Sequence, residues 1–80
     1  MEQVNNRTEH TAMRYFTKKD LIQAYTGDRF TLRTGYRWLE RELTENPGLM
    51  ERLVALGYKP KQSHLTRSQV RAIIEVLGEP

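Results

Sequence analysis

The sequence contains no cysteine and only two histidines, His10 and His64. Without cysteine there is no disulfide, no catalytic thiol and no thiolate-ligated zinc site. Apolar residues never form a run of about 18, the length that a membrane-spanning helix requires. A signal-peptide pattern and a lipidation motif are also missing. We therefore expect no metal site and no membrane contact, and a cytoplasmic location by default.

The chemistry-bearing side chains do not form a catalytic arrangement. No acidic residue lies near His64 in the sequence to orient its imidazole ring. Glu40 and Glu42 are two residues apart, so on a helix they point to different faces and cannot act as an acid and base pair. No glycine-rich phosphate loop is present. We expect no enzyme activity, no cofactor and no small-molecule substrate.

The 80 residues suffice for one small hydrophobic core and not for two domains. Residues 1–12 are polar, and Val4 is the one branched aliphatic side chain among them. Such a segment buries too little apolar surface to offset the entropy lost on ordering. The sequence therefore predicts a flexible tail over 1–12 and a single domain over 13–80.

Capping signals and periodicity predict a mainly α fold, a compact domain of four helices. The first helix begins after Thr17 and ends at Gly27, where a glycine can take a positive φ. The second runs from about residue 32 to 43 with Thr31 as its N-cap. It contains Gly35, which costs about 1 kcal/mol against alanine in a helix and is explained if another helix packs closely there.

The third predicted helix begins at Asn46 and Pro47, in the order that favours N-cap and first-turn positions. The fourth follows Thr66, which forms a capping box with Gln69. Apolar spacing predicts which side chains these two helices bury. They are Leu49, Met50, Leu53, Val54 and Leu56 in the third helix, and Val70, Ile73, Ile74 and Leu77 in the fourth.

Two segments outside the helices, residues 14–16 and 62–65, each lead into a predicted helix in a similar way. Residues 14–16 can pair with residues 62–65 as a short two-stranded ribbon.

The aromatic side chains Phe30, Tyr36 and Trp38 lie among basic residues, which would suit stacking on bases. The interpretation that we favour is that they fill the core, because a small domain with few aliphatic residues needs them there.

Charge is distributed unevenly along the chain. Residues 14–37 carry six Lys and Arg against two Asp, and residues 58–71 carry four Lys and Arg and no acid, so each segment has a net charge of +4. Arginines stand four apart from position 29 to position 41, a spacing that forms a stripe on a helix and suits an anionic partner. The alternative is a solvated face neutralised by neighbouring glutamates. The candidate nucleic-acid-binding residues are Arg29, Arg33, Arg37, Lys59, Lys61, Arg67 and Arg71.

A helix, a turn containing Gly27 and a second, arginine-rich helix follow the order of a helix-turn-helix unit. The pattern resembles the winged helix-turn-helix of mercury-resistance regulators and excisionases. The resemblance lies in the entry at residues 15–17, the helix at 31–38 and the basic segment at 57–66. It implies DNA binding through the second helix. The extra helix at 46–56 departs from that family.

A closer resemblance is carried by the C-terminal residues. The runs Leu56-Gly57-Tyr58-Lys59-Pro60 and Leu65-Thr66, then Gln69-Val70, Ile73-Ile74 and Leu77-Gly78-Glu79-Pro80, resemble a family of small bacterial proteins of gut anaerobes, a domain of unknown function. The resemblance covers about residues 15–80. It implies the fold boundaries and no activity.

Two functions of different kinds fit these residues. One is binding of double-stranded DNA through the second helix and the basic segment over 59–71. The other is an adaptor module that binds another protein through an exposed apolar patch including Trp38, Met50 or Tyr58. A single contiguous basic face would favour DNA, whereas scattered charge beside an apolar patch would favour a protein partner.

Overall fold

The computed structural model describes residues 17–80, and all four predicted helices lie within that range. They are α2 (Lys18–Thr26), α3 (Leu32–Thr44), α4 (Pro47–Ala55) and α5 (Arg67–Leu77). The mainly α fold class is therefore confirmed. The predicted tail over 1–12 and the 14–16 half of the predicted ribbon lie outside the described residues. At the edge of that ribbon, Thr17 and His64 form an isolated antiparallel bridge.

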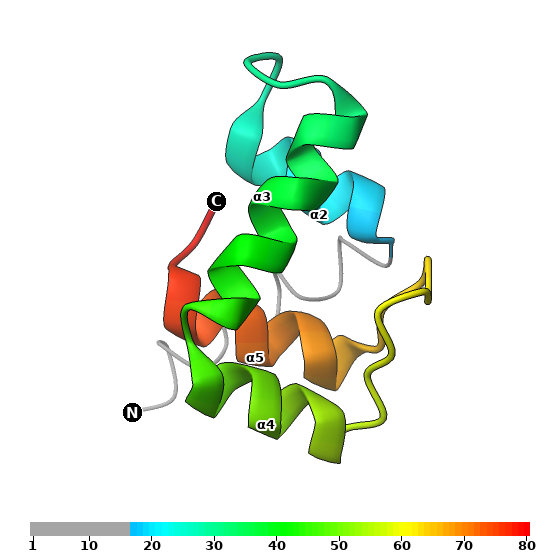
Figure 1. Ribbon diagram of the computed structural model, residues 1–80, viewed down its shortest axis with the longest axis vertical. Coiled ribbons are helices and arrows are strands. Elements are labelled where there is room, and N and C mark those ends of the chain that lie inside the picture. Colours follow the sequence, from blue (N-terminus) through cyan, green and yellow to red (C-terminus); the bar gives the residue numbers. More distant parts are fainter. Residues whose placement is uncertain (1–16) are drawn as a thin grey trace.

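The helices form two crossed pairs joined through α3 (Figure 1). α3 packs on α2 near its beginning and on α4 near its end, and α4 packs against α5. A basic connection over residues 56–66 returns the chain from α4 to α5 along one edge of the molecule. Residues 17–80 contain no strand beyond the isolated bridge, so this connection does not form the paired strands of a wing.

Local hydrogen bonds set the beginnings of three helices. The side-chain oxygens of Thr17, Thr31 and Thr66 each accept a hydrogen bond from the backbone N–H three residues later. The side-chain oxygen of Gln69 accepts a hydrogen bond from the Thr66 N–H, which completes the predicted capping box. Asn46 and Pro47 occupy the predicted N-cap and first-turn positions of α4. The Asn46 side chain does not cap the helix, however, and instead donates to the Glu42 carbonyl at the end of α3.

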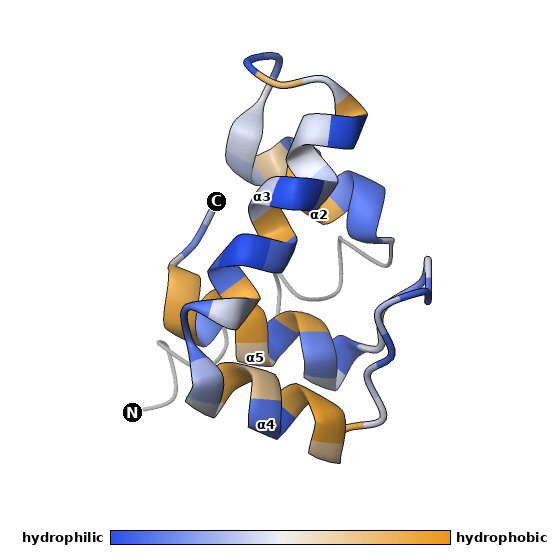
Figure 2. Cartoon of the chain, in the orientation of Figure 1, coloured by the Kyte–Doolittle hydropathy of each residue, from blue (hydrophilic) through white to orange (hydrophobic). Residues whose placement is uncertain are grey.

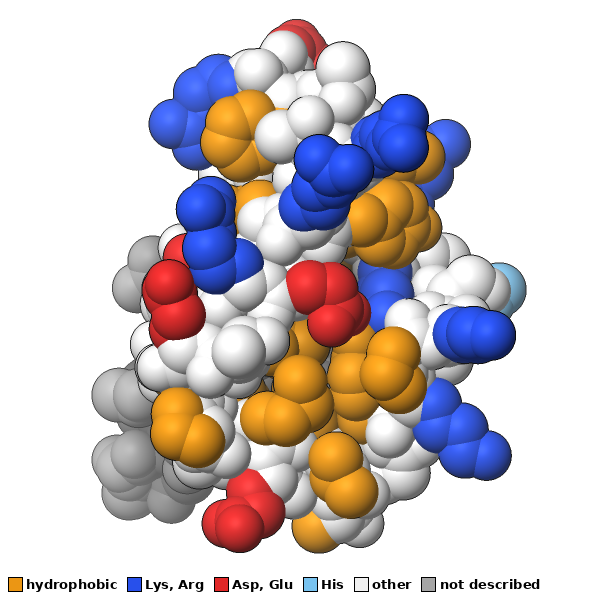
Figure 3. Space-filling model, viewed as in Figure 1, with side chains coloured by type: hydrophobic (Ala, Val, Ile, Leu, Met, Phe, Trp, Pro, Cys, Tyr) orange, Lys and Arg blue, Asp and Glu red, His pale blue; other side chains and the backbone are white. Residues whose placement is uncertain are grey.

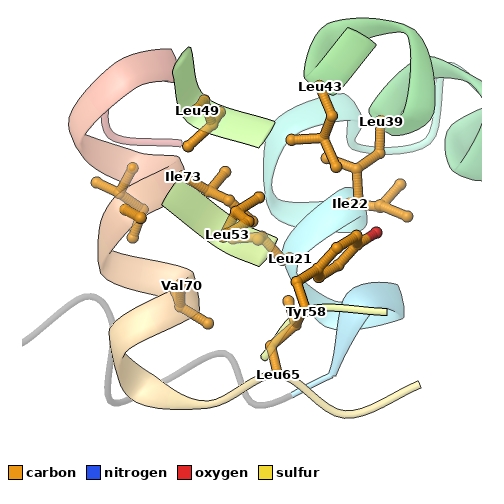
Figure 4. Packing of buried hydrophobic residues seen from close by; sticks show 12 residues of the cluster. Leu21, Ile22, Leu39, Leu43, Leu49, Leu53, Tyr58, Leu65, Val70 and Ile73 are labelled. Carbon is orange, nitrogen blue, oxygen red and sulfur yellow. The ribbon is translucent and has the colours of Figure 1, made fainter. Parts of the chain in front are cut away.

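All four helices and the connection contribute to one core (Figure 4). Leu53 and Ile73 lie together within the cluster, and both are fully buried. Hydrophobic bands on α4 and α5 contrast with strongly hydrophilic positions on the first half of α3 (Figure 2). The buried hydrophobic side chains are Leu21, Ile22, Leu39, Leu43, Leu49, Leu53, Tyr58, Leu65, Val70, Ala72, Ile73 and Ile74.

The predicted buried face of the third helix is partly wrong. Val54 is 59% exposed and Leu56 is 37% exposed, whereas Leu49 and Leu53 are buried as predicted. α4 packs between α3 and α5 along one narrow side only, so its other apolar positions face solvent. Phe30 was also expected in the core, and it is 38% exposed in the turn before α3.

Gly35 lies where α2 and α3 approach each other closely. A Cβ atom at this position would lie 2.5 Å from Cγ2 of Ile22, a side chain that is itself buried. Glycine lets the two helices meet at this distance, which confirms the predicted reason for a glycine inside the helix. This contact sets the position of α3 on α2, and therefore the direction in which the exposed face of α3 points.

Candidate nucleic-acid interface

The outward face of α3 presents a stripe of arginines. Leu39 and Leu43 point into the core, and the helical spacing places Arg33, Arg37 and Arg41 on the opposite side, where all three are exposed. Within residues 17–80, no ion pair or hydrogen bond engages these three guanidinium groups. Their charges are therefore available to an anionic partner. The alternative of a face neutralised by neighbouring glutamates finds no ion pair to support it within residues 17–80.

Arg29 does not belong to this stripe, because it lies in the turn before α3. Its Nε donates to the Thr26 carbonyl at 3.1 Å, and its Nη2 donates to the Tyr25 carbonyl at 3.4 Å. Its guanidinium group also lies 5.9 Å from the centre of the Phe30 ring. Arg29 thus satisfies carbonyl groups at the C-terminal end of α2, as cationic side chains commonly do there.

A groove of about 280 Å³ runs along the same side of α3. Two aromatic and two cationic side chains line it together with a threonine. The lining residues are Phe30, Thr34, Arg37, Trp38 and Arg41. Their spacing of three and four residues is the sequence signal for such a groove. Trp38 serves both roles, because it is also partly buried against the core as predicted, whereas Phe30 is exposed.

The second group of predicted residues lies on the connection and on α5. Lys59 and Lys61 are exposed on the connection. Arg67 is exposed at the start of α5, and Arg71 is half-buried one turn later. Both of these arginines interact with other parts of the chain. Of these four residues, only the two lysines resemble the arginines of α3, because their side-chain ammonium groups have no ion pair or hydrogen bond within residues 17–80.

A buried cluster ties the connection to α2 and α3. Lys18 is only 2% exposed, and its Nζ donates to the Pro60 carbonyl at 2.6 Å. The same Nζ lies 4.8 Å from the centre of the Tyr58 ring and 4.0 Å from a carboxylate oxygen of Glu40. The Tyr58 hydroxyl donates to Glu40 at 3.3 Å. These contacts fix the position of the neighbouring lysines relative to α3.

Burial shifts the two titratable groups of this cluster in opposite directions. Desolvation lowers the pKa of Lys18 below its usual value of 10.5, and the nearby Glu40 carboxylate partly opposes this. Desolvation raises the pKa of Tyr58 well above its usual 10.0, and the charge of Glu40 and the hydrogen bond to it raise this pKa further. The folded protein therefore keeps the Tyr58 phenol protonated in mildly alkaline solution.

The raised pKa predicts a loss of stability in alkali that depends on Tyr58. Above about pH 10 the unfolded chain releases the phenolic proton and the folded chain keeps it, so the free energy of unfolding falls as pH rises. The lowered pKa of Lys18 acts with the opposite sign, and its effect is complete once pH exceeds 10.5. In Tyr58→Phe, melting temperatures recorded between about pH 8 and 11.5 should therefore fall less than in the wild type.

Tyr36→Phe is the matched control for this experiment, because it removes a hydroxyl from a half-buried tyrosine and leaves the Tyr58–Glu40 hydrogen bond in place. It should keep the alkaline loss of the wild type. An equal alkaline loss in Tyr58→Phe and in the wild type would contradict the assignment.

The basic side chains form two groups on the face in Figure 3. One group surrounds α3 in the upper half of the view, and the other follows the connection along the edge of the molecule. Acidic and hydrophobic side chains lie between the groups, together with a small area of basic surface (Figure 3). The two basic segments thus share one face without forming an uninterrupted basic surface, and the hydrophobic side chains gather over α4.

Other kinds of site find little support in the described part of the chain. Residues 17–80 contain no group of three His, Asp or Glu side chains placed to hold a metal ion. None of their helices is long and apolar enough to cross a membrane. The fold and the α3 surface together define a small all-helical domain with one basic, groove-bearing face.

The chain belongs to a family described as a domain of unknown function, DUF4248, whose model matches residues 12–80. The match agrees with the family resemblance inferred from the C-terminal residues. Comparisons with curated proteins and with solved structures found no significant match.

Proposed function

We propose that this domain is a binding module for nucleic acid, with double-stranded DNA as its partner and α3 as its contact helix. The basic groups of α3 and of the connection are separated by acidic and hydrophobic side chains, an arrangement that by itself favours a protein partner, so the proposal rests on the α3 group. The observation that carries the proposal is the stripe of Arg33, Arg37 and Arg41, which is exposed and has no partner within residues 17–80. Like charges one helical turn apart cost a few tenths of a kcal/mol each. An arrangement that costs stability and leaves three guanidinium groups in solvent is typical of a surface that meets phosphates.

The packing of α3 supports the same proposal. Its first half projects beyond α4 and α5 and packs on α2 alone (Figure 1). A helix presented in this way can approach a groove of DNA without a clash from the rest of the domain. Lys59 and Lys61 would then contact phosphates at the flank, whereas Arg29 would act mainly by holding the turn.

The double substitution Arg33→Ala, Arg37→Ala should weaken duplex binding more than tenfold. The free energy of unfolding should change by no more than about 1 kcal/mol, because both side chains are exposed. A fluorescence-anisotropy titration against mixed-sequence duplex at low salt measures the affinity of both proteins. The logarithm of the wild-type affinity should fall with the logarithm of salt concentration by about 0.9 for each phosphate contact.

Lys19→Ala is a suitable control, because it removes an exposed positive charge that lies outside α3 and has no ion pair within residues 17–80. It should weaken duplex binding much less than the α3 pair. Equal binding by the α3 double variant and the wild type would place the contact surface elsewhere. The absence of wild-type binding at tens of micromolar, a concentration at which even non-specific complexes form, would refute the proposal.

A second candidate function rests on the exposed apolar side chains of α4. The patch predicted from the sequence does not form, because Tyr58 is only 5% exposed and Trp38 and Met50 are half-buried. Val54 in α4 and Leu56 just after it are exposed instead, and hydrophobic side chains gather over this helix in Figure 3. Exposed apolar patches often mark protein-binding surfaces. An adaptor function through α4 becomes the better interpretation if duplex binding is absent. Val54→Asp should leave any duplex binding unchanged, since it alters only this face.

A further inference from the structure

The groove on α3 combines two chemical features that are rarely placed together for packing alone. Phe30 and Trp38 offer aromatic surface, and Arg37 and Arg41 offer two guanidinium groups one helical turn apart. No acidic side chain lines the groove, and Thr34 is its remaining lining residue. A ligand that fits must therefore present a flat ring and a negative charge close to it.

The Trp38 side of the aromatic wall is held in place before any ligand arrives. The Trp38 ring packs against Tyr25 with centroids 5.6 Å apart and planes inclined at 44°. The Tyr25 hydroxyl donates to the Gly78 carbonyl beyond the end of α5, so α2 and the C-terminal turn both support this ring. Phe30, in contrast, is 38% exposed and lies near the guanidinium group of Arg29. A wall that is already ordered loses little entropy on binding.

The cationic side of the groove suits a phosphate. Residues one turn apart on a helix have their Cβ atoms about 6 Å apart, so two long guanidinium side chains can reach one phosphate group together. Neither Arg37 nor Arg41 has to leave an ion pair within residues 17–80 to do so. Guanidinium groups bind phosphate oxygens through paired, charge-assisted hydrogen bonds.

We propose that this groove binds one unpaired nucleotide of a single-stranded nucleic acid. Its base would stack on the aromatic wall, and its phosphate would lie between Arg37 and Arg41. The volume of about 280 Å³ is near the lower end of the range for small-ligand pockets, which suits a single nucleotide. The inference goes beyond the proposed function, because a paired base in a duplex cannot expose its ring face to this wall.

Trp38 provides a direct readout, because it is the only tryptophan in the chain and lines the groove. The full chain is titrated with oligothymidylate about ten nucleotides long, a length within the usual site sizes of single-strand grooves. Quenching of Trp38 fluorescence should saturate, and the affinity should exceed that for a duplex of equal length. Thymidine monophosphate should quench at higher concentration. Thymidine and inorganic phosphate should each bind more weakly than the monophosphate.

Variants separate the groove from general electrostatic attraction. Arg41→Ala and Phe30→Ala should each weaken oligothymidylate binding about tenfold. Arg33→Ala is the matched control, because it removes the same charge from the same exposed helix outside the groove, and it should weaken this binding less than threefold. Melting temperatures establish that each variant is folded, and Arg41→Gln replaces Arg41→Ala if the alanine variant is not.

The outcomes distinguish this inference from the proposed function. Duplex binding without quenching by oligothymidylate would overturn the inference and leave duplex binding standing. Quenching that is lost in Arg41→Ala, with no duplex binding, would support the groove and refute the duplex proposal. Equal weakening by Arg33→Ala and Arg41→Ala, or equal quenching by polyglutamate of the same length, would overturn the inference, because charge alone would then explain binding.

Discussion

Ile73→Asp is expected to leave the domain unfolded at room temperature. Ile73 has no solvent exposure, and its side chain lies within the core cluster (Figure 4). A carboxylate there would be buried without a partner, which costs about 3–5 kcal/mol, and the lost apolar burial adds about 2 kcal/mol or more. A single core in a chain of this length rarely supplies more than about 3–5 kcal/mol of stability, so the cost exceeds it. Thermal and urea unfolding followed by circular dichroism measures the effect.

Val76→Asp is the matched control on the same helix. Val76 is 47% exposed, so an aspartate there stays hydrated and should change the free energy of unfolding by less than about 1 kcal/mol. If Ile73→Asp melted near the wild-type temperature, α5 would be peripheral to the core. The contrast between the two variants tests burial itself, because the introduced side chain is identical.

Gly35→Leu is expected to lower the free energy of unfolding by at least about 3 kcal/mol, the upper end for overpacked sites. Even the first carbon of the new side chain would meet Cγ2 of Ile22 at 2.5 Å. Ile22 is almost fully buried, and a β-branched side chain in a helix has one strongly favoured χ1 rotamer. Relief therefore requires α2 and α3 to move apart, which urea unfolding should register.

A double-mutant cycle with alanine isolates this contact. In the wild type, Gly35→Ala should destabilise the domain by about 1–2 kcal/mol, because the clash exceeds the helix propensity gained. In an Ile22→Ala background the clashing methyl is absent, and Gly35→Ala should then be neutral or stabilising by up to about 1 kcal/mol. Equal effects in both backgrounds would show that the two residues do not interact.

Much of the candidate site follows from the spacing of charges alone. A four-residue interval predicts that Arg33 and Arg37 share a helix face, and they do. The role of Arg29 could not be predicted in this way, because its partners are carbonyl groups whose positions depend on how the turn folds. The groove was missed for a related reason, since a tryptophan at that spacing suits a core and a surface wall equally well.

The burial of Lys18 is also impossible to predict from the local sequence. A lysine in the first turn of a helix is usually exposed, yet this one is nearly fully buried beneath Tyr58. Its burial depends on a carbonyl at Pro60 and a carboxylate at Glu40, which lie far away along the chain. Nothing local to Lys18 signals these partners.

The starts of the helices and their inward-facing stripes can be derived from the amino-acid sequence, because a threonine cap or an i, i+3, i+4 repeat involves neighbours within one or two turns. Thr17, Thr31 and Thr66 act as predicted for that reason. The local sequence does not determine which apolar residues remain in solvent, because that depends on how many helices pack around each residue. Val54 and Leu56 are exposed because α4 has neighbours along one side only, and that number is set by the assembly of the whole fold.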